Sequence, residues 1–187
     1  MRVSRKAAEE SRVRVVVAAA KMMRERGIEA SSVADVMGAA GMTHGGFYKH
    51  FKSKEDLTRE AVRFAFDDVV QRFDRRRAES GPEAAVRAYI DEYLSAGHIA
   101  EPGIGCPVAA LGVDAGRHSE QFAAEFVEGA QKLIARLGGG TDSSRARASA
   151  IRRLTQMVGT IVFARAAGPG PLRDEVIAAC ADSVRAA

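Results

Sequence analysis

The chain has 187 residues, 47% of them hydrophobic and 28% charged, and a formal net charge of +4. This length allows one domain with a sizeable core, or one small and one medium domain. No apolar run reaches the roughly 18 residues of a membrane span, no secretory signal pattern is visible, and two cysteines do not make a disulfide framework, so we expect a cytoplasmic protein without a membrane partner.

The charge is unevenly distributed along the chain. Residues 1–54 hold 11 Lys and Arg against 5 Asp and Glu, whereas residues 55–187 hold 17 against 19. A basic first third indicates that one end of the protein faces a polyanion, although a solvated basic face would show the same imbalance. The four histidines are scattered and no Cys or His pair has zinc-ligand spacing, so we expect no metal site and no cofactor.

Nearly every segment has helical periodicity and no run alternates with period two, which predicts an all-α fold. The first helix carries apolar residues three and four positions apart, namely Val13, Val16, Val17, Ala20 and Met23. Gly27 follows where a left-handed residue ends a helix. Ser32, Thr43 and Ser53 are expected to cap the next three helices, and Gly41 breaks the first of these.

The rest of the sequence predicts longer helices. One begins at Gly81-Pro82, because proline is tolerated in the first helical turn. Residues 97–116 are expected to be irregular, since proline and glycine recur there, and further helices cover about 118–137, 143–167 and 171 to the C-terminus. The last two helices carry small and branched residues that allow close packing, which predicts a homodimer interface.

Residues 32–51 have the pattern of helix, tight turn and helix. In a helix-turn-helix the second helix places its N-terminal residues against base edges in the major groove. The inward positions are apolar, at Val36, Met37, Met42, Phe47 and Phe51. The outward positions are small or can form hydrogen bonds, at Thr43, His44, Gly45, Gly46, Tyr48, Lys49 and His50. The pattern predicts that residues 31–54 bind duplex DNA.

Two adjacent glycines are unusual in a short helix. Gly45 and Gly46 together cost about 2 kcal/mol of helix stability relative to alanine. Because glycine has no side chain, Gly45 and Gly46 would let the helix backbone approach the floor of the DNA major groove, which is the role we assign to them. The alternative is that the pair is simply a turn.

The stretch from Ser31 to Leu57 resembles the DNA-binding signature of the TetR family of transcriptional regulators. The likeness is carried by Ala40-Gly41-Met42-Thr43-His44-Gly45-Gly46-Phe47-Tyr48-Lys49-His50-Phe51-Lys52-Ser53-Lys54-Glu55-Asp56-Leu57, and covers about the first 60 residues with the helix end Arg24-Glu25-Arg26-Gly27-Ile28. The resemblance implies a three-helix DNA-binding domain over residues 1–53. A helical bundle for ligand binding and dimerisation is implied over residues 54–187. Gly46 departs from the family pattern, in which Thr or Ser is frequent, so one DNA contact is in doubt.

The resemblance also implies roles for single residues. Ser32 and Thr43 would donate to phosphates from helix N-termini, where the helix dipole favours anions. Tyr48, His50 and Lys54 would contact the DNA backbone, although Tyr48 could instead be a core aromatic and His50 a helix-end cap. The residues nearest the bases would be His44, Gly45, Gly46 and Lys49. Base contacts carry sequence information, so His44 and Lys49 are the specificity candidates.

The remainder of the chain carries no motif of comparable strength. The run from Gly105 to Leu111 resembles a motif of a family subset in which some members sense electrophiles through a cysteine. Cys106 is therefore either a sensor or a small buried residue, and reactivity requires exposure and a lowered pKa. Residues at helical core spacing could line a ligand pocket or only pack the core: Tyr89, Tyr93, Phe122, Phe126, Met157 and Phe163.

The predicted function is that of a ligand-responsive repressor. An apolar or electrophilic small molecule would release the homodimer from a palindromic double-stranded operator. The alternative is a DNA-binding regulator that responds to no effector. An enzyme is not expected, because the carboxylates of Asp67-Asp68 and of Asp91-Glu92 are adjacent in sequence and point about 100° apart on a helix.

Overall fold

The computed structural model describes residues 5–140 and 143–186, in which helices and turns occur without any strand. The predicted all-α fold is confirmed. In chain order the elements are α1 (Arg5–Arg26), α2 (Val33–Ala39), the 3-10 helix η1 (His44–Lys49), α3 (Lys54–Ser80), α4 (Pro82–Tyr93), α5 (Ala96–Ala100), the 3-10 helix η2 (Pro102–Ile104), α6 (Pro107–Ala115), α7 (Glu120–Leu137), α8 (Ser144–Ala167) and α9 (Pro171–Ala186).

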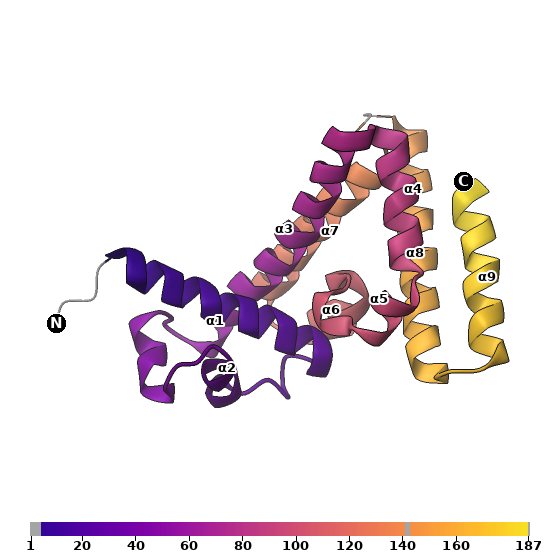
Figure 1. Ribbon diagram of the computed structural model, residues 1–187. Coiled ribbons are helices and arrows are strands. Elements are labelled where there is room, and N and C mark those ends of the chain that lie inside the picture. Colours follow the sequence, from indigo (N-terminus) through magenta and orange to yellow (C-terminus); the bar gives the residue numbers. More distant parts are fainter. Residues whose placement is uncertain (1–4, 141–142, 187) are drawn as a thin grey trace.

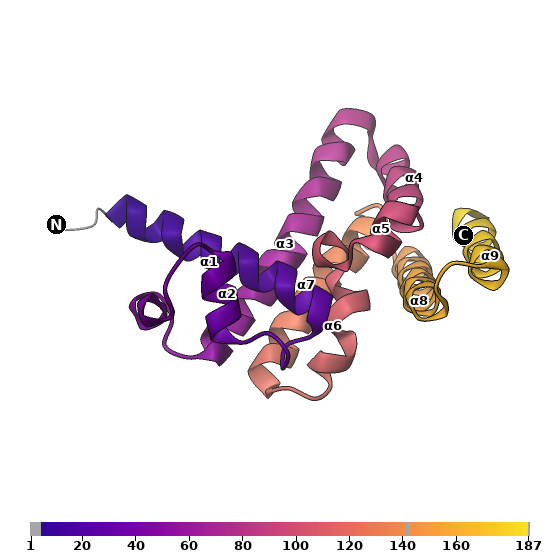
Figure 2. The same ribbon diagram turned by 60° about the horizontal axis from the view of Figure 1, so that its bottom comes forward.

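The helices form an elongated molecule with two distinct ends (Figures 1 and 2). Helices α1 and α2 lie at one end, and the pair α8 and α9 lies at the other. The long helix α3 leads away from the first group and packs along α7, and α4 returns beside it (Figure 1). No helix within the described part of the chain is both long and apolar enough to cross a membrane.

Glycines in the left-handed region end the first two helices, as predicted. Gly27 has φ 84° after α1, and Gly41 has φ 71° after α2. Around Gly41 the N–H of Met42 donates to the carbonyl of Met37 at 2.9 Å, and the N–H of Gly41 donates to Gly38 at 3.0 Å. This pair of bonds is a Schellman motif, which turns the chain sharply toward η1.

Two of the three predicted serine and threonine caps are confirmed. The hydroxyl of Ser32 accepts from the N–H of Asp35 at 3.1 Å, and that of Ser53 accepts from Asp56 at 3.1 Å. Thr43 occupies the N-cap position of η1, but its side chain makes no capping hydrogen bond, so that prediction is wrong. Helix α4 begins at Pro82 after Gly81, whose φ is 83°.

The expectation that residues 97–116 are irregular is wrong in part. Pro102 begins η2 and Pro107 begins α6, so both prolines start a helix where they were expected only to interrupt one. Proline is compatible with the first turn because that turn has N–H groups without helical partners. Short helices α5, η2 and α6 therefore replace the expected loop.

Two apolar clusters share helix α3. The first joins α1, α2 and η1 to the first half of α3 and includes Leu111 and Phe122 from later helices. The second contains the rest of α3 from Val69 onward, together with parts of α4, α7, α8 and α9. The predicted division after residue 53 coincides with the start of α3, yet the first cluster continues along α3 as far as Phe66.

Candidate DNA-binding surface and ligand cavity

Two buried phenylalanines hold η1 against the rest of the first cluster. Phe47 is 1% exposed and Phe51 is 2% exposed, and their rings stack with centroids 5.6 Å apart. Both pack in the cluster that contains Val36 and Met37 of α2. Of the predicted inward-facing residues, Val36, Met37, Phe47 and Phe51 are thus confirmed as core, whereas Met42 is only partly buried against them.

Arg12 on α1 fastens the end of η1, a role that the sequence does not reveal. Its Nε donates to the carbonyl of His50 at 3.4 Å, and its guanidinium lies 4.8 Å from the centre of the Phe51 ring. The same guanidinium pairs with both carboxylate oxygens of Glu60 on α3, and this hydrogen bonding raises the pKa of Arg12. Arg12 therefore positions η1 relative to both longer helices.

The outward face of η1 lies open to solvent. Thr43, His44, Gly45, Tyr48 and Lys49 are exposed, and Gly46 and His50 are half-buried. Tyr48 is 74% exposed, which rules out the core alternative for its ring. His50 is the C-cap residue of η1 through its backbone, whose N–H donates to Phe47 at 2.9 Å.

Ser32 and Lys54 have partners within the chain. The Ser32 hydroxyl donates to a carboxylate oxygen of Asp35 at 2.8 Å, and Lys54 Nζ lies 3.5 Å from the carbonyl of Glu29. A contact to a phosphate would take the Ser32 hydroxyl proton from Asp35, whereas the Lys54 ammonium has three N–H donors and can keep its bond to Glu29. Both predicted contacts therefore start from an engaged side chain, whereas Lys49 forms no ion pair in the described part of the chain.

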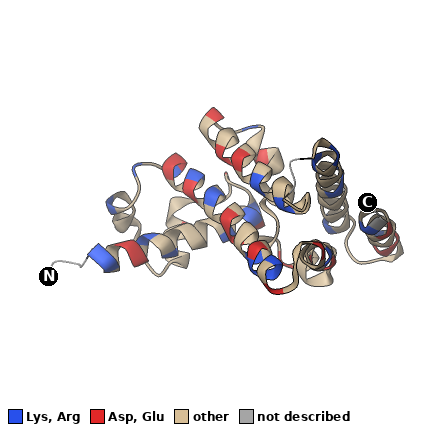
Figure 3. Cartoon of the chain, turned by 90° about the horizontal axis from the view of Figure 1, so that it is seen from above, with Lys and Arg blue, Asp and Glu red and all other residues tan. Residues whose placement is uncertain are grey.

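Apart from Asp35, which is bonded to Ser32, the helix-turn-helix region has no acidic residue. Residues 36–54 contain Lys49, Lys52 and Lys54 but no Asp or Glu. Figure 3 shows basic but no acidic colouring on the small helix η1. The long helices α1, α3 and α7 carry both signs, whereas α8 carries only basic residues. This sign of charge favours a polyanion at the η1 surface.

The backbone of η1 does not require its two glycines. Neither Gly45 nor Gly46 has a positive φ. A Cβ at Gly45 would meet nothing within 4 Å, and one at Gly46 would lie 3.5 Å from the Met37 side chain, an ordinary contact. The alternative that the pair is a turn is inconsistent with the 3-10 helix that both residues occupy.

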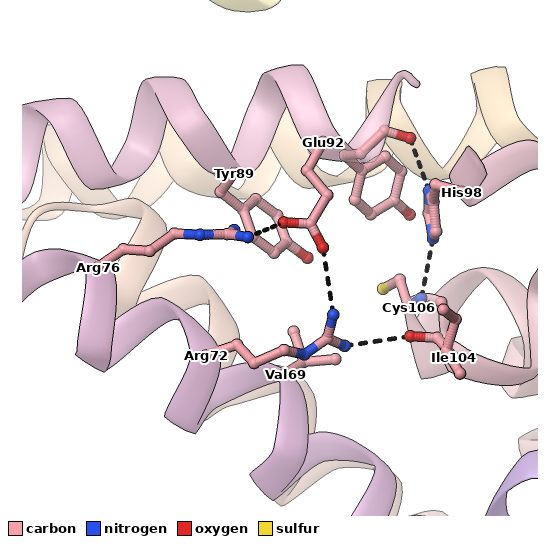
Figure 4. Close-up of a pocket in the computed structure, with 10 residues that line it drawn as sticks. Val69, Arg72, Arg76, Tyr89, Glu92, His98, Ile104 and Cys106 are labelled. Atoms are coloured by element: carbon pink, nitrogen blue, oxygen red, sulfur yellow. Dashed lines mark hydrogen bonds and ion pairs between the residues drawn. The ribbon is translucent and has the colours of Figure 1, made fainter. Parts of the chain in front are cut away.

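A cavity of about 30 Å³ lies between α3, α4 and the segment 98–106 (Figure 4). This volume is about that of one water molecule. Charges at the cavity are balanced in ion pairs, because Arg72 contacts Glu92 at 3.1 Å and Asp68 at 3.2 Å, and Arg76 pairs with Glu92. The lining residues are Val69, Arg72, Arg76, Tyr89, Glu92, Tyr93, His98, Ile104, Gly105 and Cys106.

His98 secures one wall of this cavity. Its Nε2 accepts from the backbone N–H of Cys106 at 3.0 Å, so Nδ1 carries the proton and donates to the carbonyl of Tyr93 at 2.6 Å. Burial is the main cause that lowers the pKa of His98, which favours this neutral form. Gly105 lets the ring approach, since a Cβ there would lie 2.6 Å from Nε2. The imidazole is thus occupied by backbone groups and does not serve as a base for the Cys106 thiol.

Comparison with known proteins agrees with this geometry. Residues 15–61 match the model described as "Bacterial regulatory proteins, tetR family". This match spans α2 and η1 with the adjoining parts of α1 and α3. It is 35% identical over 111 residues to an HTH-type transcriptional regulator, Rv0196, of Mycobacterium tuberculosis, covering 59% of this chain and 56% of that protein. It is 39% identical over 57 residues to the HTH-type transcriptional repressor KstR2 of Mycolicibacterium smegmatis, covering 30% and 28%.

Solved structures of tetR-family regulators share the fold of the whole chain. A regulator from Agrobacterium tumefaciens superposes with a TM-score of 0.77 at 21% identity, covering 94% of this chain and 98% of that one. The family and the curated relatives bear names of transcriptional regulators, not of enzymes. This chain spans about half the length of the curated relatives it matches.

Three of the seven predicted ligand residues line the cavity, namely Tyr89, Tyr93 and Cys106. Phe122 lies in the first cluster, fully buried, and Phe126 packs beside it with its ring 5.4 Å from that of Phe66. Met157 is fully buried in the second cluster. Phe163 was expected at core spacing but is 43% exposed on α8.

No motif in the sequence indicates the charged half of the cavity. Arg72 and Arg76 are spaced by one helical turn on α3 and both meet Glu92 of α4. The one available signal is this spacing of two arginines, which also fits a solvated helix face. Cys106 itself is 3% exposed, as expected for the small buried residue, and it lines the cavity.

Arg24 joins the cavity wall to the helix-turn-helix region. This side chain on α1 is 6% exposed, and it donates to the carbonyl of Gly105 at 2.9 Å and to that of Ala20 at 3.0 Å. Burial lowers the pKa of Arg24 to about 10. Gly103 in the same wall approaches α1 so closely that a Cβ would lie 2.5 Å from Glu25.

Proposed function

We propose that the chain is a sequence-specific DNA-binding transcriptional regulator, a repressor, that places η1 in the major groove of duplex DNA. The observation that carries this proposal is the Gly45-Gly46 pair. Helical glycines cost stability, and nothing in the surrounding structure requires a glycine at either position. An external surface that approaches the backbone closely explains them, and base edges in a groove are such a surface. The nine predicted contact residues remain proposals, with His44 and Lys49 as the base readers.

We also propose that the regulator binds its operator as a homodimer. One short recognition helix makes few contacts, and a two-fold dimer doubles them over a palindrome. Small and branched residues of the last two helices were expected at the interface, but two of them on α8, Ala150 and Leu154, are already buried within the chain. Large apolar side chains remain exposed on the same two helices, and they would favour contact with a second copy: Ile151, Val162, Phe163 and Leu172.

A small apolar or electrophilic effector is proposed to weaken operator binding from the cavity. Arg24 supplies a physical connection, because an occupant that moves Gly105 also moves the end of α1. Reciprocal linkage then requires the operator to weaken effector binding by the same factor. The alternative, a regulator without an effector, is favoured by the small volume of the cavity, about 30 Å³.

Replacing Gly45 by alanine tests the role of the glycine pair. We expect Gly45→Ala to raise the free energy of unfolding by about 0.5 to 1 kcal/mol, since alanine is a better helix former and its Cβ meets open space. We expect affinity for a duplex selected from a randomised library to fall by roughly tenfold, because the added methyl keeps the backbone from the bases. Denaturant unfolding and fluorescence anisotropy measure the two effects.

Gly112→Ala on α6 is the matched control, since a Cβ there makes an ordinary 3.9 Å contact with Phe126. It should stabilise the protein by a similar amount and leave duplex affinity unchanged. If Gly45→Ala binds DNA as tightly as the parent, the glycine pair has no role at the groove. If the parent binds no duplex at low salt, the proposed function itself is wrong.

Lys49→Ala and Lys54→Ala separate base reading from backbone contact. Lys49 lies on the exposed face of η1, so its loss should change the preferred operator sequence. Lys54 begins α3, and its loss should weaken binding to all sequences alike and reduce the slope of log affinity against log salt by about 1. Binding of each variant to a randomised operator library at several salt concentrations provides the measurement. Identical behaviour of the two variants would contradict this assignment.

A further inference from the structure

Two buried phenols at the cavity have no hydrogen-bond partner stronger than a thiol. Tyr89 is 7% exposed and Tyr93 is 3% exposed, and within the described residues 5–140 and 143–186 their hydroxyls meet only the thiol of Cys106, a weak acceptor. Arg72 Nε lacks a partner in the same part of the chain. Figure 4 shows the Tyr89 hydroxyl pointing to the side of the cavity where Cys106 and Arg72 lie. Buried polar groups are rarely left unbonded, so these donors indicate an absent acceptor.

The charges at the cavity indicate that this acceptor is uncharged. Arg72 and Arg76 are paired with the carboxylates of Glu92 and Asp68, and Arg24 and Arg165 behind the cavity wall donate to backbone carbonyls, so each guanidinium at the cavity is already engaged. Burial, followed by the neighbouring Cys106, raises the pKa of Tyr89 and of Tyr93, so both remain neutral donors.

A molecule that only accepts hydrogen bonds needs no acceptor from the cavity, whereas a water that accepts from both phenols must place its own two protons on acceptors. The carbonyls of Tyr93 and Ile104 each already accept one hydrogen bond, from His98 and Arg72 at 2.6 and 3.1 Å, and Oε2 of Glu92 is paired with Arg76. A carbonyl oxygen accepts two hydrogen bonds and donates none. Ile104 lines the cavity and is 51% exposed, so the cavity reaches the surface beside an apolar side chain.

We propose that this cavity binds small, uncharged carbonyl compounds, with the carbonyl oxygen between the hydroxyls of Tyr89 and Tyr93 and the apolar part against Val69 and Ile104. The role of such a compound as the effector rests on the proposed function, whereas the binding site does not. About 30 Å³ accommodates the carbonyl group, and the remainder of the compound lies toward the mouth at Ile104.

Cyclopentanone is a suitable probe, because it carries one carbonyl and does not react with thiols under mild conditions. We expect cyclopentanone labelled with ¹³C at the carbonyl to bind the full chain and to show a downfield shift of that resonance, as hydrogen bonding to the oxygen requires. Methylenecyclopentane has the same shape without an acceptor and should bind at least about tenfold more weakly. Cyclopentanecarboxylate, which adds a negative charge, should also bind more weakly.

Tyr89→Phe and Tyr93→Phe test the two donors separately. Each should weaken cyclopentanone binding by about fivefold to tenfold and reduce the carbonyl shift. The melting temperature of the unliganded variants should be unchanged or higher, because each lost hydroxyl had no partner stronger than a thiol, whereas a structural hydroxyl would leave a less stable protein. Tyr48→Phe, on the exposed face of η1, is the control and should change neither quantity.

The inference is overturned if the double variant Tyr89→Phe/Tyr93→Phe binds cyclopentanone as tightly as the parent. It is also overturned if the carboxylate binds more tightly than the ketone, or if millimolar cyclopentanone does not bind. Duplex binding by the unliganded parent is measured in parallel. Loss of ketone binding with intact duplex binding contradicts only this inference, whereas ketone binding without duplex binding contradicts only the proposed function.

Discussion

Replacing Gly129 by alanine is expected to lower the free energy of unfolding by about 2 to 3 kcal/mol, although alanine is the better helix former. Gly129 lies in α7 where that helix packs on α3, and a Cβ there would lie 2.2 Å from the ring of Phe66. Phe66 is 1% exposed and its ring is fixed against Phe126, so it cannot withdraw into solvent. Overpacking of about 3 kcal/mol therefore outweighs a helix gain of about 1 kcal/mol.

Denaturant unfolding of Gly129→Ala beside Gly112→Ala measures this balance. The control places the same methyl group in a helix with only an ordinary 3.9 Å contact, and should stabilise the protein. Phe66→Ala should cost less stability in the Gly129→Ala background than alone, since it removes the ring atoms that overlap the new methyl group. Equal stability of the two alanine variants would show that α3 and α7 can separate locally at no cost.

Local features of the sequence were sufficient to predict where most helices begin and end. Gly27, Gly41 and Gly81 each occupy a left-handed conformation that alanine would not tolerate, and each ends a helix where the periodicity stops. Ser32 and Ser53 cap the following helices through bonds to residues three positions ahead. These signals depend on neighbours in the chain, so they can be read without knowing the tertiary structure.

Features that depend on packing between distant segments could not be predicted in this way. Gly129 gives no local sign that Phe66 lies above it. Phe122 and Phe163 both lie at helical core spacing in the sequence. In the structure Phe122 is fully buried near the helix-turn-helix region, whereas Phe163 is 43% exposed. The cavity combines α3, α4 and the segment 98–106, and only the tertiary fold brings Arg72 to Tyr89. The site near η1 was more predictable because it is local in sequence.

Phe47 and Tyr48 are neighbours in η1, and replacing each by alanine is expected to change the free energy of unfolding by very different amounts. Phe47 is 1% exposed in the first cluster, so Phe47→Ala should lower the free energy of unfolding by about 3 to 5 kcal/mol. A loss of that size is comparable to the total stability of many domains, and duplex binding should disappear with the fold. Tyr48 is 74% exposed and contacts Phe47 edge-on at 5.2 Å, so Tyr48→Ala should cost less than about 1 kcal/mol.

The same Tyr48→Ala variant should nevertheless weaken duplex affinity by about tenfold, because its hydroxyl and ring face the DNA in the proposed complex. Unfolding curves and duplex titrations on both variants separate folding from binding. Tyr48→Phe distinguishes the two parts of the side chain, since it removes only the hydroxyl that would donate to a phosphate. If Tyr48→Ala binds duplex normally while Phe47→Ala remains folded, then η1 is neither the DNA-contacting surface nor part of the core. If Tyr48→Ala binds duplex normally but Phe47→Ala unfolds, η1 still belongs to the core, and the DNA contact must come from another exposed face of the helix-turn-helix region.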